Sequence, residues 1–368
     1  MSDQVVYVPV NQLHSFIRDV LLACGVPQDD AETCAEVIIT SDKKGIESHG
    51  IGRLKYYYER IKAGQHKVIT EFEIVREGPT TAVVDGHHGM GMVVAKRSMQ
   101  MAIDKAKAYG TGCVVVRNST HFGIAGYYPL MAARQGCIGM TYTNARPSVS
   151  PTFGVQPMLG TNPIAFACPT DEENPFSFDG ATPIIQRGKI EVLARAEKPV
   201  KPGWVIDEQS EYITDSAVAL STLGKGTAAF LPLGGAGEEM GGHKGYGLGT
   251  MVEILSASLQ GGSFLLSLTG VSPEGKPQPF RVGHFFMAID VEHFTSLDDF
   301  KATTGQIMRD LRNSKKAPNQ PRIYVAGEKE FEMEKVTRER GIAVNANLQK
   351  EILYLKKELG LDQYEFPF

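Results

Sequence analysis

The run Thr81-Ala82-Val83-Val84-Asp85 begins the part of the sequence that decides the fold. Its β-branched and apolar residues predict a strand, and residues 93–109 then repeat apolar positions at helical spacing. Residues 113–117 predict a second strand, residues 125–135 a second helix and residues 138–143 a third strand. This alternation predicts a sheet with helices packed against it.

The turn after the first of these strands does not have the usual dinucleotide-binding pattern. Gly86-His87-His88-Gly89-Met90-Gly91 lies between a strand and a helix, which is the position of a Rossmann phosphate turn. Its glycines, however, are spaced Gly-x-x-Gly-x-Gly, and the next strand ends in Arg117-Asn118, where an acidic ribose ligand would be expected. This stretch therefore argues against a Rossmann fold.

Length and charge narrow the class of protein. The chain has 368 residues, of which 42% are hydrophobic, so it is long enough for two or three domains with a large core. Its formal net charge is −4, and basic residues nowhere form a block longer than a pair. A nucleic-acid partner and a membrane surface are therefore not expected, and a small molecule is the expected partner.

The start of the chain and the cysteines predict a cytoplasmic protein. The first residues lack the basic segment and apolar run of a secretory leader, and no apolar stretch is long enough to span a bilayer. The five cysteines are scattered and form no Cys-x-x-Cys pair, which is typical of reduced thiols. No cysteine or histidine spacing supports a metal site, so no metal is expected.

Helical patterns at both ends predict a second domain. Residues 9–44 read as two helices, and residues 296–312 and 327–359 are again helical and charged. Each end is too small to bury its apolar face alone. We therefore predict a discontinuous helical domain from residues 1–75 and 296–368, beside a cofactor- and substrate-binding domain of residues 76–295.

A glycine-rich stretch that carries one lysine predicts an anion site. Residues 241–249 read Gly-Gly-His-Lys-Gly-Tyr-Gly-Leu-Gly and lead into an apolar run that predicts a buried helix. Backbone N–H groups at a helix start have no partner of their own, and Lys244 adds a positive charge. A flexible turn with a solvated lysine explains the same pattern, and the spacing is not that of a P-loop.

Two short polar clusters suggest acid–base chemistry. Glu47-Ser48-His49-Gly50-Ile51-Gly52-Arg53 combines a hydroxyl, an imidazole and a guanidinium, which can bind a carboxylate and move a proton. Asn118-Ser119-Thr120-His121-Phe122-Gly123 follows a predicted strand, where ligands collect in α/β proteins. Taken singly, the first cluster could be a helix cap and His121 a structural histidine.

Together these motifs resemble the type 2 malate/L-lactate dehydrogenase family, and the resemblance runs from about Val8 to about Gly341. The motifs occur in the family's order: Ser48-His49-Gly50 with Arg53, Asn118 to Gly123, Gly160-Thr161-Asn162-Pro163, Asp179-Gly180-Ala181-Thr182, Gly188-Lys189, and Lys244-Gly245-Tyr246-Gly247-Leu248. The family implies a non-Rossmann α+β fold that binds NAD or NADP on a mixed sheet with flanking helices. It also implies a homodimer, which we expect to have its active-site cleft near the interface.

The resemblance assigns roles residue by residue. His121 matches the acid/base histidine, and Ser48, His49 and Lys189 match further positions assigned to catalysis. Lys189 is aspartate in the imine reductases of the family, which favours a hydroxy-acid substrate. Arg53 matches a position in the substrate cleft. The positions that match cofactor contacts are Gly123, Asn144, Thr161, Asp179, Gly180, Ala181 and Lys244.

Three departures from the family pattern bear on the cofactor site. Gly180 stands where methionine is usual, residues 238–242 look like a short insertion, and Ala326-Gly327-Glu328 replaces the usual Pro-Gly-Glu. The predicted reaction is hydride transfer between C2 of a small L-2-hydroxy acid, malate first, and a nicotinamide. Ureidoglycolate, sulfolactate, diketogulonate or a cyclic imine as substrate, and a non-catalytic dinucleotide-binding protein, are the alternatives.

Overall fold

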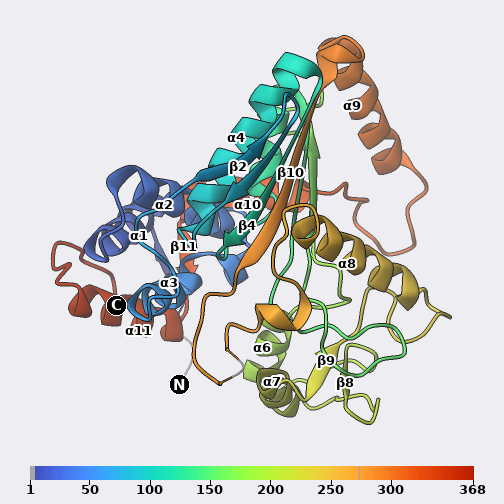
Figure 1. Ribbon diagram of the computed structural model, residues 1–368. Helices are drawn as coiled ribbons and strands as arrows, with labels where there is room; N and C mark the ends of the chain where they lie inside the picture. The colour runs from blue at the N-terminus through green and yellow to red at the C-terminus, as the bar shows by residue number, and fades with distance from the viewer. Residues whose placement is uncertain (1–4, 273) are drawn as a thin grey trace.

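The computed structural model describes residues 5–272 and 274–368. Within this part of the chain, the main sheet has seven strands in the order β2-β3-β4-β10-β5-β6-β7 (Figure 1). The pair β3–β4 is parallel and the other neighbours are antiparallel. The strands are β2 (Glu73–Glu77), β3 (Thr81–Asp85), β4 (Thr111–Ser119), β5 (Cys137–Thr143), β6 (Ile164–Cys168), β7 (Phe176–Gly180) and β10 (Val282–Asp290).

The predicted alternation of strands and helices is confirmed, and the sheet contains four further strands, β2, β6, β7 and β10, that the sequence analysis did not predict. Helix α4 (Gly91–Tyr109) joins β3 to β4, and α5 (Tyr127–Arg134) joins β4 to β5. Sequence analysis missed β10, which lies between β4 and β5 and pairs with both. Its run Val-Gly-His-Phe-Phe-Met-Ala-Ile-Asp is apolar on both faces, so it lacks the alternation that identifies a half-buried strand.

Helices cover the two faces of the sheet unequally. On one face, α4 packs on β4 and β10, and α5 packs on β5 and β6. The side chains beneath them, such as Val114, Phe286 and Ala165, are fully buried. On the other face, α8 (Gly242–Ala257) packs against the ends of β10, β5 and β4. The fold is therefore a mixed sheet with flanking helices, as predicted.

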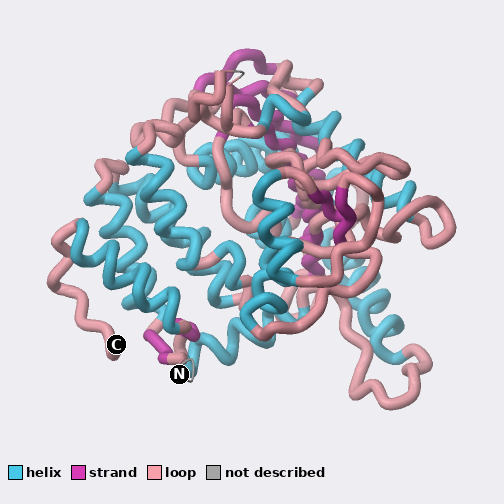
Figure 2. The backbone as a smooth tube through the Cα atoms, turned by 90° about the horizontal axis from the view of Figure 1, so that it is seen from below, coloured by secondary structure: helices cyan, strands magenta, loops and turns pink. Residues whose placement is uncertain are grey.

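The two ends of the chain meet beside this sheet. The predicted pair of N-terminal helices is confirmed as α1 (Val10–Ala23) and α2 (Gln28–Lys43), followed by α3 (Leu54–Lys62). The prediction that residues 327–359 are helical throughout is wrong. They form helix α10 (Glu328–Arg340), strand β11 (Ile342–Val344) and helix α11 (Ala346–Glu358). Strand β11 pairs with β1 (Val6–Val8), and the two termini lie close together (Figure 2).

A smaller core lies below the sheet. It joins α6 (Arg187–Arg195), α7 (Ser216–Lys225), β8 (Val205–Asp207) and β9 (Ala228–Phe230) through Ile190, Val205, Ala219 and Phe230. The main core runs without a break from α1 and α2 to α4 and the central strands, and it includes Ile352 and Leu355 of α11. The division into two domains stays a prediction.

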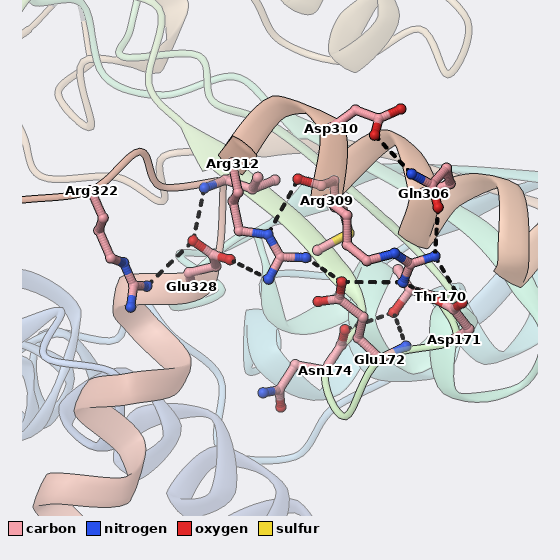
Figure 3. A network of polar contacts seen from close by, with 12 residues as sticks. Thr170, Asp171, Glu172, Asn174, Gln306, Arg309, Asp310, Arg312, Arg322 and Glu328 are labelled. Atoms are coloured by element: carbon pink, nitrogen blue, oxygen red, sulfur yellow. Dashed lines mark hydrogen bonds and ion pairs between the residues drawn. The ribbon is translucent and has the colours of Figure 1, made fainter. Parts of the chain in front are cut away.

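Helix α9 (Leu297–Asn313) extends from the upper end of the sheet. Ion pairs fix it to the turn between β6 and β7: Arg309 binds Asp171 at 2.9 Å, and Arg312 binds Glu172 (Figure 3). Arg312 also reaches Glu328 at the start of α10, at 3.2 Å. These pairs hold a helix in which only Gly305 and Met308 are buried.

All five cysteines are unpaired, and three of them are buried. In the part of the chain that the structure describes, no helix is both long and apolar enough to cross a bilayer. Among the same residues, no group of three or more His, Cys, Asp or Glu side chains could hold a metal ion.

Candidate active site

A cavity of about 690 Å³ lies between the helical end of the molecule, the sheet and the smaller core. It brings together most of the residues selected from the sequence, although they come from separate elements. The selected residues that line it are Ser48, His49, Arg53, His121, Gly123, Asn144, Thr161, Asp179 and Ala181. Gly180, Lys189 and Lys244 are not among its lining residues. Lys189 lies exposed on α6 and Lys244 lies exposed in the first turn of α8.

Two short 3-10 helices, η1 (Glu47–His49) and η2 (Ile51–Arg53), present the first cluster to the cavity. The buried carboxyl group of Asp42 holds them, because its Oδ2 accepts a hydrogen bond from the Ile51 N–H at 2.7 Å. Burial raises the pKa of Asp42 to about 8. A Cβ atom at Gly50 would lie 1.8 Å from Asp42 Oδ1, so this close approach requires glycine.

His121 is oriented by a buried tyrosine. Its Nδ1 lies 2.7 Å from the hydroxyl oxygen of Tyr57, which is fully buried on α3. The Gly123 N–H approaches the same nitrogen at 3.4 Å. Since Nδ1 is engaged by the protein, Nε2 is the ring nitrogen left for a substrate.

The surroundings of His121 keep its ring neutral. Desolvation lowers its pKa well below the ordinary value of 6.5, and the nearby His49 and Arg53 lower it further. The His49 ring stacks on it, with ring centres 5.5 Å apart, and His49 Nδ1 lies 2.8 Å from the Ser48 hydroxyl. Desolvation, with a contribution from Arg53, lowers the pKa of His49 to about 4. Both histidines are therefore uncharged near pH 7, and each can accept a proton.

Arg53 supplies a positive charge to the cavity. Its Nε donates to the Ser48 carbonyl oxygen at 2.6 Å, which fixes the base of the guanidinium. Its terminal amino groups make no ion pair with any described residue. A guanidinium held by one edge in this way leaves two parallel N–H donors for a carboxylate.

The cavity continues into a second compartment of about 300 Å³. The two share Ile46, Ile124, Asp179 and Glu330 as lining residues. Asp179 accepts a hydrogen bond from the Gly126 N–H at 2.7 Å, and desolvation raises its pKa to about 6. The second compartment adds Lys44, Tyr324 and Lys329, which are a suitable lining for the anionic and aromatic parts of a long ligand.

A buried network supports the cavity wall from behind. Glu253, on the inner face of α8, accepts hydrogen bonds from Asn162 Nδ2 at 2.8 Å and from the Leu265 N–H at 2.9 Å. Asn144 Nδ2 lies 3.4 Å from the same carboxyl group, and Asn144 Oδ1 accepts from the Gly283 N–H at 2.8 Å. Asn144 is 2% exposed, so it holds the wall together while lining the cavity.

Sequence reasoning missed two residues of this site. The three tyrosines of α3 were visible in the sequence, but no local pattern shows that Tyr57 would meet His121, 64 positions away. Arg146 lines the cavity two residues after Asn144 and makes no ion pair with any described residue. The sequence offered Lys55 and Arg187 as alternative cations for a second substrate carboxylate, and of these Lys55 does not line the cavity. Arg187 does line it and is paired with Glu191 at 3.1 Å.

A neutral histidine beside a guanidinium without an ion partner is an arrangement that suits a dehydrogenase of small hydroxy acids, because it offers a base for the hydroxyl proton and a cation for the carboxylate. The chain belongs to the malate/L-lactate dehydrogenase family, whose model matches residues 8–353. This confirms the resemblance that the motifs predicted.

Known proteins resemble the chain over nearly its whole length. A malate dehydrogenase of Pyrococcus horikoshii is 42% identical over 362 residues, which cover 98% of each chain. An L-sulfolactate dehydrogenase of Methanocaldococcus jannaschii is 39% identical and matches 94% of this chain and 95% of its own. The crystal structure of malate dehydrogenase from Entamoeba histolytica, 43% identical, superposes with a TM-score of 0.95 and covers 99% of this chain and 100% of its own.

Proposed function

We propose that this enzyme transfers hydride between C2 of L-malate and the nicotinamide of NAD or NADP. One observation carries the proposal: His121 lines the same cavity as Arg53 and Arg146, and neither of these two guanidinium groups makes an ion pair with a described residue. Malate has one hydroxyl group to deprotonate and two carboxylates to bind. The names of the similar proteins, malate and sulfolactate dehydrogenases, also favour a 2-hydroxy acid with a second anionic group.

In the proposed mechanism, each residue acts at one atom of the substrate. Arg53 binds the C1 carboxylate through two N–H donors, which prevents rotation of C2. His121 Nε2 takes the proton of the C2 hydroxyl during oxidation and returns it during reduction. The Tyr57 hydroxyl accepts from Nδ1–H when Nε2 is the base, and it holds the ring in one orientation throughout.

The two joined compartments fit an extended dinucleotide. We propose that Gly123, Asn144, Thr161, Asp179 and Ala181 hold its nicotinamide half beside His121, and that the second compartment holds the adenosine half. When bound, the cofactor supplies the nicotinamide ring that exchanges hydride with the substrate. Roles for Gly180, Lys189 and Lys244 remain predictions, since these residues do not line the larger cavity.

Initial rates test the proposal directly. Malate, lactate, sulfolactate and ureidoglycolate should each be assayed with NAD and with NADP, and the reverse reaction with a cyclic imine and diketogulonate. The highest kcat/KM is expected for malate, and the same series identifies the preferred cofactor. A higher kcat/KM for another acid would identify that acid, and not malate, as the preferred substrate. Cofactor binding without any turnover would contradict an enzymatic function.

Arg146→Gln tests whether Arg146 binds the second carboxylate of malate. We expect kcat/KM to fall about 10-fold or more for malate, because a charged hydrogen bond contributes about 1.5–3 kcal/mol. For lactate, which has one carboxylate, it should change less than about 3-fold. Arg97→Gln, which alters an arginine that pairs with Asp30 outside the cavity, is the matched control. An equal loss for both substrates would show that Arg146 does not bind the second carboxylate.

The pH profile should show the low pKa of His121. Because that pKa lies well below 6.5, the base stays deprotonated as the pH falls through the neutral range. Oxidation measured as kcat/KM should therefore stay level from about pH 8 down to about pH 6, where an ordinary histidine would already be largely protonated. A fall centred near pH 6.5 would contradict the neutral, desolvated histidine.

We also propose that the enzyme works in the cytoplasm as a homodimer. Five unpaired cysteines fit a reducing compartment.

A further inference from the structure

A second large cavity lies at the helical end of the molecule. It encloses about 690 Å³ between α1, α2, α5 and α10, and we call it the helical cavity. Among the described residues, it shares no lining residue with the active-site cavity. It shares only Lys44 and Leu130 with the second compartment. The helical cavity is therefore a separate site.

The lining of the helical cavity has more positive than negative charge. Its five basic side chains and three carboxylates are Lys43, Lys44, Arg134, Arg338 and Arg340, and Glu36, Glu334 and Glu339. Two of the carboxylates are already paired. Glu36 binds Lys96, which does not line the cavity, at 2.6 Å, and Glu334 binds Lys43 at 3.1 Å. The remaining positive charge has no matching anion in the lining.

The buried residue of this charged set is Lys44, which follows the last turn of α2 and is 7% exposed. Its Nζ lies 4.1 Å from the centre of the Phe331 ring. The ammonium group makes no ion pair and no hydrogen bond with any described residue. Lysine is almost never buried without an ion partner, and contact with an aromatic ring compensates only part of the lost hydration. The Lys44 ammonium group therefore lacks an anion.

A second cation without an ion partner lies near Lys44. Arg134, in the last turn of α5, lines the same cavity and makes no ion pair with any described residue. Burial lowers the pKa of Lys44, the carboxylate of Glu334 partly offsets this change, and the charge of Arg134 lowers the pKa further. Two neighbouring like charges repel each other, and an anion bound between them would turn this repulsion into attraction.

We infer that the helical cavity binds a small molecule with at least two anionic groups, carboxylate or phosphate, one of which lies between Lys44 and Arg134. Arg340 is available for the second group, since its guanidinium carbon lies 4.0 Å from the centre of the Tyr7 ring and makes no ion pair with a described residue. The volume is within the range of small-molecule sites. This ligand would lie outside the cavity that contains His121, so the inference does not depend on which hydroxy acid is the substrate.

Titration calorimetry with citrate and with pyrophosphate, in 0.15 M NaCl, tests the site. Arg53 and Arg146 are replaced by glutamine in every protein used, so that the active-site cavity does not bind the probe. At least one probe should bind with a Kd below about 1 mM, and acetate, with a single carboxylate, at least about 10-fold more weakly. The tighter of the two probes identifies a carboxylate or a phosphate ligand. Absence of binding by both probes up to about 10 mM would overturn the inference.

Three further substitutions in the same protein locate the bound anion. Arg134→Gln and Lys44→Gln should each raise the Kd of the tighter probe about 10-fold or more, because each removes a charged hydrogen bond. Lys329→Gln is the matched control, since Lys329 lines the second compartment and not the helical cavity, and it should change the Kd less than about 3-fold. Arg134 is exposed, so its replacement leaves the core intact, and melting followed by circular dichroism checks each fold.

Two outcomes of these titrations would contradict the site. An equal Kd for Arg134→Gln and its parent protein would show that the anion does not bind beside Arg134. Weaker binding to Lys329→Gln, without a change for Arg134→Gln, would place the anion in the second compartment.

Discussion

Replacing His121 by asparagine is expected to lower kcat for malate oxidation by about 10²–10⁴-fold, the range that a general base contributes. Asparagine keeps a polar side chain but cannot take the hydroxyl proton at neutral pH. Cofactor affinity, measured by titration calorimetry, should stay within about 3-fold of wild type, because most of the proposed contacts lie on other residues.

Tyr57→Phe is the companion variant, since it removes only the hydroxyl group that holds His121 Nδ1 at 2.7 Å. We expect it to lower kcat less than His121→Asn does and to leave KM nearly unchanged, as befits a positioning residue. A near-normal kcat for His121→Asn would remove this histidine from the mechanism and leave His49 as the base.

Deleting the chain from Ala343 onward is expected to abolish folding. The deletion removes Val344, Ile352 and Leu355, which are at most 1% exposed in the main core, together with the pairing of β11 with β1. It also removes Leu348 and Leu359, which are partly buried against that core. Each buried side chain contributes roughly 1.5–3 kcal/mol, so the loss approaches or exceeds the whole stability of a typical domain, about 5–15 kcal/mol.

Two neighbouring residues of α11 provide a matched pair for the same measurement. Ile352→Ala should cost about 2–5 kcal/mol in the free energy of unfolding, because Ile352 is 1% exposed. Leu353→Ala should cost less than about 0.5 kcal/mol, because Leu353 is 40% exposed. A truncated protein that melts as wild type and stays active would show that α11 is an appendage.

Local sequence patterns were sufficient to predict a structural element wherever the contacts that determine it are close in sequence. Strands β3, β4 and β5 and helices α1, α2, α4 and α5 could be predicted because hydrophobic periodicity is a property of a short segment. The η1–η2 cluster and His121 could be selected because glycine, histidine and arginine at short spacing restrict both backbone and chemistry. The resemblance then assigned them to one cleft, where the structure places them.

The tertiary structure decided what depends on residues far apart in the chain. Nothing in residues 282–290 shows that β10 pairs between β4 and β5, and nothing near Ile342 shows that it pairs with Val8. Tyr57 of α3 and Arg146 join the site only when segments far apart in the chain fold together. The sequence by itself thus determined the local elements and the family's chemistry. Tertiary packing decided which strands pair and which residues contact each catalytic atom. These contacts join residues far apart in the chain, so they depend on the packing of the whole molecule and not on any local pattern.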